Sequence, residues 1–440
     1  MSSLTDDVNF RTYCALDALS TRHCKPSLVS DMKEYGVYDF YHRIVHPLTK
    51  IVSGMNRRGV WVDQSARVAA TTDLEIRIKE RQEELNSIAG RELNIAGDDL
   101  RTFLYDEVGL PYPFRRPWET KRSTNKETLL ALKEHVPEVA LMLDGIIELR
   151  QLTTFVNTFL IVGDDVDDNG RVHPQFRLGP VTGRLSCKKP DFHNVPDGIP
   201  RSIYSASPGK ILIGADYSQV EFRIFAILGH CLALLEGFAR GEDAHTMNTK
   251  IIMGRSDIEV HKLFKKIRTV IKRFSFGMIY GGKLQTLVTA VREAFNLLGE
   301  HVSEVQVHAA VERFFTLNPQ AQEFMTQCRI GTLETRLMYN RFGRLRIFFG
   351  PKRDVPGEAG NYPMQSGAGD VINTRMLKID PVIPESILIQ VHDSLILEVD
   401  EEEGEEKKAQ VKELMEEPIP EFDGYQFPVS IKLGKNWAEV

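Results

Sequence analysis

The pattern of apolar and polar positions divides the N-terminal part of the chain into helices. Residues 40–62 fit an amphipathic helix that ends at Gly59 and continues into a short strand. Residues 64–89 predict a long polar helix that ends near Gly90, with one apolar face for packing. That face consists of Val68, Leu74, Ile78 and Leu85.

A basic, proline-rich segment at residues 111–127 interrupts the helices, and we expect it to form a loop. Thr124 to Glu127 fits a capping box, which predicts a helix from there to about Pro137. A further helix is expected from Glu138 to Leu160. Residues 64–160 are therefore expected to be helical, with an exposed basic loop.

The second half of the chain adds strands. Residues 209–218, GKILIGADYS, predict a buried strand ending in Asp216, and residues 218–350 return to helical periodicity. Residues 386–400 give two apolar β runs around a tight turn, and 401–417 an acidic amphipathic helix. Helical blocks between separated strands indicate an α+β fold.

The composition is that of a folded globular protein. Of 440 residues, 42% are hydrophobic and 26% charged, and this length favours two to four domains. Without a long apolar run or a signal-peptide pattern, we expect a cytoplasmic protein with no membrane partner. The net charge of −6 argues against a small basic DNA-binding module, although a large enzyme can segregate its charges. The five cysteines form no CxxC pair, so we expect neither a zinc site nor a disulfide framework.

Two acidic residues, Asp216 and Asp393, lie at the ends of predicted strands. A carboxylate in this position is costly unless it is paired or bound to a metal. If the strands share a sheet, the two acids can meet and hold a pair of Mg²⁺ ions, which activates an attacking hydroxyl in phosphoryl transfer. The residues alone leave a plainer interpretation open, in which Asp216 caps the next helix and Asp393 fills a turn.

A basic and aromatic helix is predicted between the two acids. Four of its residues recur at steps of four and share a face: Arg268, Lys272, Phe276 and Tyr280. Cations suit a triphosphate and an aromatic ring suits a base, although a solvated basic face with core aromatics fits the same spacing. We expect Gly281 and Gly282 to end this helix, and Gly277 to allow close packing on its other side.

At these residues the chain resembles the polymerase domain of family A DNA polymerases, the group typified by bacterial DNA polymerase I. The likeness runs from about Phe40 to the C-terminus, roughly 90% of the chain, with the motifs in the family's order. The matching segments are TGRLSCKKPDFHNVP (182–196), DYSQVEFR (216–223), GEDAHT (241–246), RTVIKRFSFGMIYG (268–281), NYPMQ (361–365), QVHD (390–393) and GKNW (434–437).

The resemblance implies a right-hand fold of thumb, palm and fingers around an antiparallel palm sheet. Residues 1–39 would be a linker or the remnant of a 3′–5′ exonuclease domain. The palm would comprise 40–63, 166–230 with motif A and 366–440 with motif C. The thumb would be 64–165 and the fingers 231–365, with motif B.

It also implies a template-directed DNA polymerase that extends a primer with deoxynucleotides and releases pyrophosphate. Asp216, Asp393 and the Tyr217 carbonyl would hold two Mg²⁺ ions, and Lys272 would neutralise or protonate the pyrophosphate. Further nucleotide contacts would come from Arg268, Phe276, Tyr280, Glu221, His245 and Gln219, with Glu221 blocking a ribose 2′-hydroxyl. DNA contacts would come from Arg184, Gln365, Asn361 and His392, and from Arg115, Arg116, Lys121 and Arg122 in the thumb loop.

Two departures from the family pattern qualify this expectation. Position 394 is Ser where the family usually has Glu, which keeps open a single-subunit RNA polymerase or a reverse transcriptase-like enzyme. Gly357 stands where the family usually has a basic residue, and Arg353 is a candidate to compensate. A non-catalytic DNA-binding subunit is the third alternative, although the acids and Lys272 are in place.

The N-terminal segment YCALD (13–17) resembles the last motif of the family's 3′–5′ exonuclease domain, with Tyr13 and Asp17 as its remnant. We therefore expect no intrinsic proofreading. A separate exonuclease chain or a processivity factor remains an open partner. Two origins fit this pattern: a natural polymerase whose exonuclease is on another chain, or a truncated fragment. The missing 5′ nuclease domain and the compact loops favour a phage enzyme.

Overall fold

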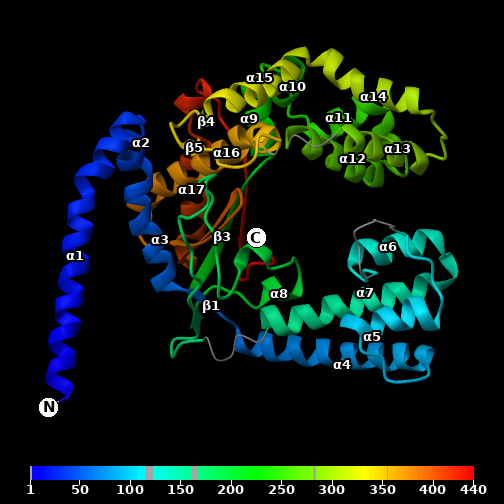
Figure 1. Cartoon of the computed structure of the whole chain (residues 1–440), viewed down its shortest axis with the longest axis horizontal. Coiled ribbons are helices and arrows are strands. Elements are labelled where there is room, and N and C mark those ends of the chain that lie inside the picture. The colour runs from blue at the N-terminus through cyan, green and yellow to red at the C-terminus, as the bar shows by residue number, and fades with distance from the viewer. Residues whose placement is uncertain (1, 114–121, 161–165, 281–283, 354) are drawn as a thin grey trace.

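The computed structural model describes residues 2–113, 122–160, 166–280, 284–353 and 355–440. It confirms the α+β class, because a small antiparallel sheet is combined with extensive helices (Figure 1). Within the described residues, no helix is both long and apolar enough to cross a membrane. All five cysteines are free thiols.

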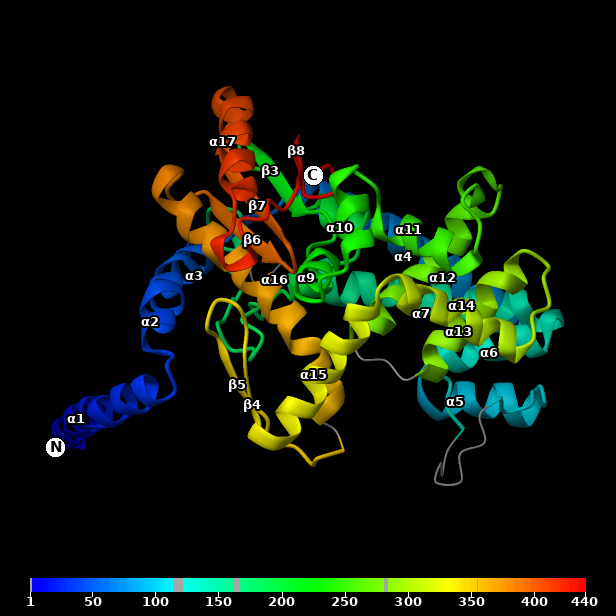
Figure 2. The same cartoon turned by 90° about the horizontal axis from the view of Figure 1, so that it is seen from above.

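The first helix, α1 (Ser2–Glu34), extends away from the rest of the chain in both Figure 1 and Figure 2. A short helix, α2 (Tyr38–Phe40), and a π-helical turn at Tyr41–Val45 then lead into α3 (His46–Arg58). Gly59 ends α3 with a φ of 66° and leads into strand β1 (Val60–Trp61), as the sequence predicted.

A helical arm follows β1. It consists of α4 (Gln64–Ala89), α5 (Gly97–Thr102), a π-helical turn (Phe103–Glu107), α6 (Lys126–His135), α7 (Ala140–Thr154) and a second π-helical turn (Phe155–Leu160). A hydrophobic core of its own, which includes Leu85, Leu129 and Ile146, holds these helices together. The arm therefore has a packed interior separate from that of the sheet.

Two details of the arm differ from the prediction. The residue that caps α6 is Asn125, whose side chain accepts a hydrogen bond from the Thr128 amide, and not Thr124. The Thr124 carbonyl instead accepts a hydrogen bond from Arg150 of α7. Val68 does not belong to the buried stripe of α4, because its side chain is 55% exposed.

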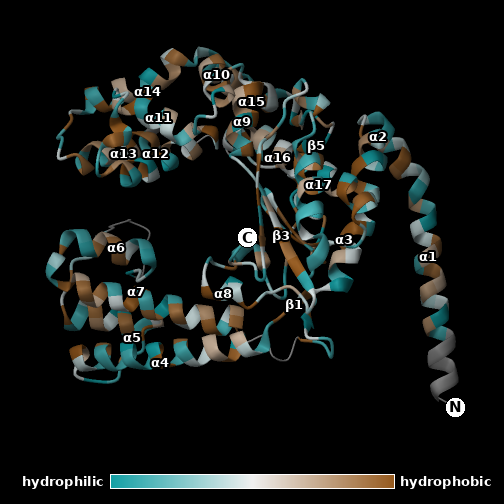
Figure 3. Cartoon of the chain, turned by 180° about the vertical axis from the view of Figure 1, so that it is seen from behind, coloured by the Kyte–Doolittle hydropathy of each residue, from teal (hydrophilic) through white to brown (hydrophobic). Residues whose placement is uncertain are grey.

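The central sheet has the strand order β6-β7-β3-β8, and every neighbouring pair is antiparallel. Its strands are β3 (Lys210–Tyr217), β6 (Ile387–Val391), β7 (Ser394–Asp400) and β8 (Val429–Gly434). Strand β3 lies between β7 and β8 and is hydrophobic along most of its length (Figure 3). The predicted strand pair around the turn at His392 and Asp393 is confirmed. A second small pair joins β1 to β2 (Arg171–Val172).

A second helical block follows β3. It contains α9 (Val220–Leu228), α10 (Leu232–Ala239), α11 (Ala244–Met253), α12 (Phe264–Ile279), α13 (Leu284–Leu297), α14 (Glu304–Leu317) and α15 (Pro319–Thr335). Its buried residues form one continuous core with the sheet. Figure 1 shows this block and the helical arm projecting to the same side of the sheet.

The prediction of helix throughout 218–350 was wrong near its end. Strands β4 (Leu337–Tyr339) and β5 (Leu345–Ile347) form a hairpin there. The asparagine and glycine in the turn supply its hydrogen bonds and a φ of 93° at Gly343, which helical periodicity does not reveal. The long helix α16 (Val355–Val382) then packs against α15, α9 and α3, and α17 (Gly404–Glu416) is the predicted acidic helix.

Candidate functional site

The pairing of β3 with β7 brings Asp216 and Asp393 together although 177 positions separate them. Asp216 is directly opposite Ser394 in the antiparallel register, and the Tyr217 amide donates a hydrogen bond to the Asp393 carbonyl at 3.1 Å. The N-cap position of α9 is occupied by Gln219, so Asp216 does not cap that helix. The interpretation in which the two acids meet in one sheet is the one that the fold supports.

Both carboxylates are held in surroundings that disfavour their charged forms. Burial and the neighbouring Asp393 raise the pKa of Asp216 to about 7. Burial also raises the pKa of Asp393, and the nearby cations Arg184 and Lys272 offset only part of this rise. Two buried carboxylates that repel each other are stabilised when one of them is protonated or when a cation binds between them.

Two residues beside these acids have left-handed backbone conformations. Gln219 has a φ of 58° and His392 a φ of 53°, in a region that residues other than glycine rarely adopt. Such strain persists only where the surrounding structure holds it, and it is concentrated at functional sites. Here it sets the turn after β3 and the turn between β6 and β7, which present the two acids.

Helix α12 places its predicted face toward the acids. The rings of Phe276 and Tyr280 stack with centroids 5.5 Å apart, and the Lys272 ammonium lies 5.6 Å from the centre of the Phe276 ring. On the other side of the helix, Gly277 leaves room for Leu287, whose Cδ2 would lie 3.1 Å from an added Cβ. The expected helix end at Gly281 and Gly282 lies outside the described residues, and α12 itself ends at Ile279.

A polar chain links α12 to the sheet side of the site. The Tyr280 hydroxyl donates a hydrogen bond to the carboxylate of Glu221, and Arg184 forms an ion pair with the other oxygen of that carboxylate. Burial raises the pKa of Tyr280, which keeps its hydroxyl protonated as a donor. Glu221 is only 8% exposed, so this carboxylate is fixed in place.

Asp243, which the sequence analysis did not select, organises the phosphate-binding candidates. Its carboxylate accepts two hydrogen bonds of 2.8 Å from the Arg268 guanidinium and another from the Gln219 amide. The same side chain caps α11 at the Thr246 amide. The motif GEDAHT contained the signal, but only His245 was chosen from it.

His245 itself is nearly buried in the wall of the site. Burial is the main reason that its pKa is lowered to about 4. The nearby charge of Asp243 raises this pKa, and those of Arg268 and Lys272 lower it. The imidazole is therefore neutral at pH 7. Its Nδ1 atom is buried without a hydrogen-bond partner in the described structure.

These side chains converge on one cleft of about 580 Å³. The predicted site residues that line it are Asp216, Tyr217, Asp393, Lys272, Arg268, Phe276, Tyr280, Glu221, His245, Gln219, Arg184 and His392. A larger cavity of about 770 Å³ lies between α10 and residues 422–428, but none of the predicted site residues lines it. The 580 Å³ cleft is thus the candidate site.

The other predicted contacts lie elsewhere. Asn361 and Gln365 are on α16 and are absent from the cleft lining. Arg115, Arg116 and Lys121 lie outside the described residues. Arg122 forms an ion pair with Asp106 within the arm.

His193 is a second residue that the sequence analysis missed. Its ring lies 5.9 Å from that of His392, centroid to centroid, and burial lowers the pKa of both imidazoles. The quoted segment DFHNVP carried this histidine, but nothing in its spacing linked it to the turn at His392.

The acid pair fits a divalent cation. Mg²⁺ is commonly held by one or two carboxylates together with substrate phosphates and water. No cluster of three or more His, Cys, Asp or Glu suited to a metal occurs in the part of the chain that the structure describes. The hydroxyl of Ser394, opposite Asp216, donates a hydrogen bond of 2.9 Å to the Val391 carbonyl. The two carboxylates therefore leave coordination positions that water and the phosphates of a substrate can fill.

Comparison with known proteins identifies the family of the chain. The family model for DNA polymerase family A matches residues 65–439. Thermostable DNA polymerase I of Thermus thermophilus is 30% identical over 429 residues, and that of Thermus filiformis 31% over 432. Each alignment covers 91% of this chain and 48% of the relative, so the chain spans about half the length of these relatives.

A solved structure shares the fold. It is described as the POL domain of Pol1 from M. smegmatis in complex with DNA primer-template and dNTP. The two superpose with a TM-score of 0.82 and 24% identity, over 94% of this chain and 73% of that one. This likeness confirms the expected right-hand fold.

Proposed function

The chain belongs to DNA polymerase family A, and we propose that it is a template-directed DNA polymerase. It adds deoxynucleotides to a primer 3′ end by two-metal phosphoryl transfer and releases pyrophosphate. The observation that carries this proposal is the single cleft in which an acid pair faces the cations and stacked rings of α12. Its partners are primer-template DNA and dNTPs.

The subdomains follow from this proposal. Residues 64–165, which contain the helical arm, are the thumb that grips product duplex, and the second block with α12, within 231–365, forms the fingers. The sheet and its connections in 40–63, 166–230 and 366–440 form the palm. The separate core of the arm supports its assignment as a unit that moves against the palm.

Asp216 and Asp393 hold the metal ions, and the Tyr217 carbonyl assists. Two Mg²⁺ ions held there would supply Lewis-acid activation of the primer hydroxyl and would neutralise charge on the triphosphate. The two carboxylates must be ionised to bind them, and their raised pKa values make this step sensitive to pH.

The face of α12 holds the incoming nucleotide. Arg268 and Lys272 bind the triphosphate, and Lys272 neutralises or protonates the leaving pyrophosphate. Phe276 packs on the sugar and base, and Tyr280 lies next to the template base. His245 is neutral at pH 7, so it contributes a hydrogen bond to a phosphate oxygen and no positive charge. Gln219 orients Arg268 through their shared partner Asp243.

Contacts to DNA come from both sides of the cleft. Arg184 and Gln365 bind minor-groove acceptors that are common to all correct base pairs, so they check pair shape and not sequence. His392 lies by the primer terminus and Asn361 by the template. Arg115, Arg116 and Lys121 contact phosphates of the product duplex, which adds affinity that falls as salt rises.

Sugar selection separates this proposal from an RNA polymerase. Ser394 is the residue that favours the RNA polymerase alternative, and its hydroxyl is engaged in the turn before β7. Glu221 favours deoxynucleotides, because its fixed carboxylate lines the same cleft as the sugar-binding ring of Phe276 and occupies space there. A non-catalytic subunit would have no reason to keep two strained acids facing Lys272.

Primer extension tests the proposal. Wild type, Asp393→Ala and Asp400→Ala are compared with Mg²⁺ and with dNTPs or NTPs supplied separately. Asp400 is at the other end of β7, exposed and paired with Lys210, so its variant is the matched control. We expect extension with dNTPs by wild type and Asp400→Ala and none by Asp393→Ala. Extension with NTPs would favour the RNA polymerase, and no extension with either would contradict the proposed function.

The same reactions with a mismatched primer test the expected lack of 3′–5′ trimming, which stays a prediction. The expected phage origin also stays a prediction. Tyr13 lies on α1, is 63% exposed and is not among the residues that line the cleft. Magnesium-dependent trimming of the mismatched primer by the pure chain would contradict that prediction.

A further inference from the structure

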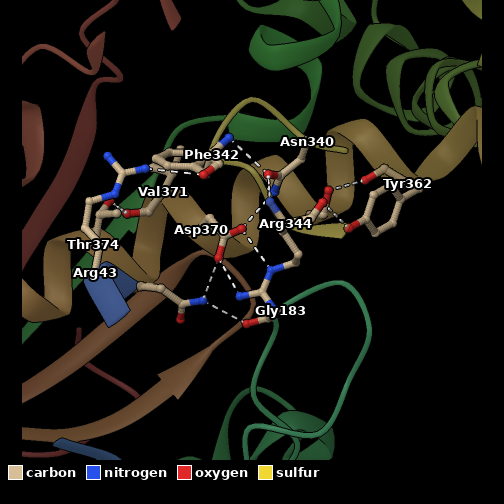
Figure 4. A network of polar contacts seen from close by, with 11 residues as sticks. Arg43, Gly183, Asn340, Phe342, Arg344, Tyr362, Asp370, Val371 and Thr374 are labelled. Carbon is tan, nitrogen blue, oxygen red and sulfur yellow. Dashed lines mark hydrogen bonds and ion pairs between the residues drawn. The ribbon is translucent and has the colours of Figure 1, made fainter. Parts of the chain in front are cut away.

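Asp370 on α16 is a completely buried carboxylate outside the cleft (Figure 4). Arg344 binds it through two hydrogen bonds, from Nε at 2.9 Å and from Nη2 at 2.7 Å. Asn340 donates to it at 2.8 Å and Asn373 at 3.2 Å. The carboxylate is therefore fully partnered, which a buried charge requires.

These partners tie a β-hairpin to α16. Asn340 and Arg344 lie at the two ends of the turn between β4 and β5, and the Asn340 side chain accepts hydrogen bonds from the Phe342 and Arg344 amides. The Tyr362 hydroxyl of α16 donates to the Arg344 carbonyl at 3.0 Å. The turn is thus held rigidly, and it presents the Arg344 guanidinium in one orientation.

The same cluster touches the segment Thr182–Arg184, which leads into the cleft. Asn373 donates a hydrogen bond of 2.9 Å to the Gly183 carbonyl. Gly183 has a φ of 78°, and a Cβ added there would lie 2.5 Å from the Arg344 guanidinium. A Cβ on Gly369 would lie 2.9 Å from the Thr182 carbonyl and 3.2 Å from the Arg184 amide. The backbone of this segment is therefore clamped between Arg344 and α16.

The side chain of the next residue, Arg184, enters the cleft and pairs with Glu221. Its direction depends on the backbone at Gly183, because a left-handed residue just before it sets where the chain turns. An error of about 1 Å in a group that contacts a substrate is enough to cost much of its effect on rate.

We propose that Arg344 and Asp370 are positioning residues for Arg184, which they hold through the Gly183 turn so that it meets the primer-terminal base pair. This inference rests on the proposed function, in which Arg184 binds a minor-groove acceptor of that pair. Neither residue touches substrate. Their contribution is to make the Arg184 contact with the base strong and selective.

The test compares primers ending in guanine with primers ending in 3-deazaguanine, in which a C–H group replaces the minor-groove acceptor N3. Single-turnover dNTP incorporation is measured with Mg²⁺ for the full chain and its variants. Losing a hydrogen bond from a charged donor should slow wild type on the modified primer by roughly 10- to 100-fold. Arg184→Ala is the reference for an enzyme that lacks this contact, and it should extend both primers at similar, low rates.

Asp370→Asn and Arg344→Lys are the test variants, and Gly183→Ala is a third that displaces the clamp from the other side. All three should extend normal primers slowly and respond to the modified base less than about threefold. Arg346→Lys is the matched control, because Arg346 lies in the same hairpin but pairs with Glu358. It should keep the full wild-type response.

The rate lost on replacing guanine with 3-deazaguanine distinguishes a positioning role from a merely structural one. If the folded variants keep the wild-type response to 3-deazaguanine, even with a lower unfolding midpoint, the positioning role is wrong while the proposed function stands. If Asp370→Asn does not fold, Arg344→Lys and Gly183→Ala decide in the same way. If wild type extends neither primer, the proposed function fails and this inference fails with it. If wild type extends both equally, Arg184 does not bind N3 and the inference is overturned.

Discussion

The hydroxyl of Tyr280, at the end of α12, donates a hydrogen bond to the carboxylate of Glu221 in the first turn of α9. Arg184 holds the other oxygen of the same carboxylate. Glu221 is therefore restrained from two sides and cannot swing aside to admit a larger substrate. Because Glu221 lines the cleft between α12 and the sheet, its side chain forms a fixed part of the wall of the nucleotide site.

Replacing Glu221 with Ala should relax the selection of deoxynucleotides over ribonucleotides. Removing the side chain opens space for a 2′-hydroxyl, and we expect the ratio of kcat/KM for dNTP over NTP to fall by about 10- to 200-fold. Glu221→Gln keeps the volume and removes the charge, so it should keep most of the selectivity. An unchanged ratio in Glu221→Ala would contradict the role of this wall.

The acid pair predicts a pH dependence of magnesium use. A pKa of about 7 for Asp216 means that the metal must displace a proton at pH 6 but not at pH 8. The Mg²⁺ concentration for half-maximal rate should therefore rise as pH falls below 7, by up to about tenfold per pH unit for one displaced proton. Asp400→Asn should behave like wild type. A flat Mg²⁺ requirement from pH 6 to pH 8, in protein shown to be folded by circular dichroism, would contradict the prediction.

Phe276→Tyr should raise the use of dideoxynucleotides. Phe276 presents an apolar ring beside Tyr280 and His245, so the side chain at position 276 itself offers the sugar no hydrogen bond. A tyrosine hydroxyl would supply one, and a single hydrogen bond corresponds to roughly a tenfold gain in relative incorporation. Competition between a ddNTP and its dNTP in one extension reaction measures this ratio. Equal ratios for wild type and Phe276→Tyr would refute the assignment of this position.

The sequence was informative wherever a residue's role follows from local periodicity. The four-residue spacing from Arg268 to Tyr280 predicted the cleft face of α12, and the apolar runs predicted β3, β6 and β7. The meeting of Asp216 and Asp393 needed one further assumption, that their strands share a sheet, and that assumption proved correct.

What the sequence could not supply were the contacts made by residues remote in the chain. Asp243 appeared only as part of a motif, and its pairing with Arg268 depends on how α11 packs on α12. The hairpin at residues 337–347 was read as helix because its strands have only three residues each, too few for a period of two to be visible. Nothing in the local sequence marks Asp370, because its partner Arg344 lies on a separate hairpin that packs against α16.

His245 predicts that the protein loses stability in mild acid. Its pKa of about 4 lies below the ordinary value of 6.5, so unfolding takes up a proton at any pH between the two. Its contribution to stability is complete above pH 6.5 and is lost as the pH falls toward 4, by about 2 kcal/mol between pH 7 and pH 5.

Urea unfolding at these two pH values, followed by circular dichroism, measures the loss. In His245→Gln the loss should be smaller by that amount, whereas His308→Gln, at a partly exposed position on α14, should match wild type. The same pH dependence in His245→Gln and wild type would show that this histidine is not held neutral by burial.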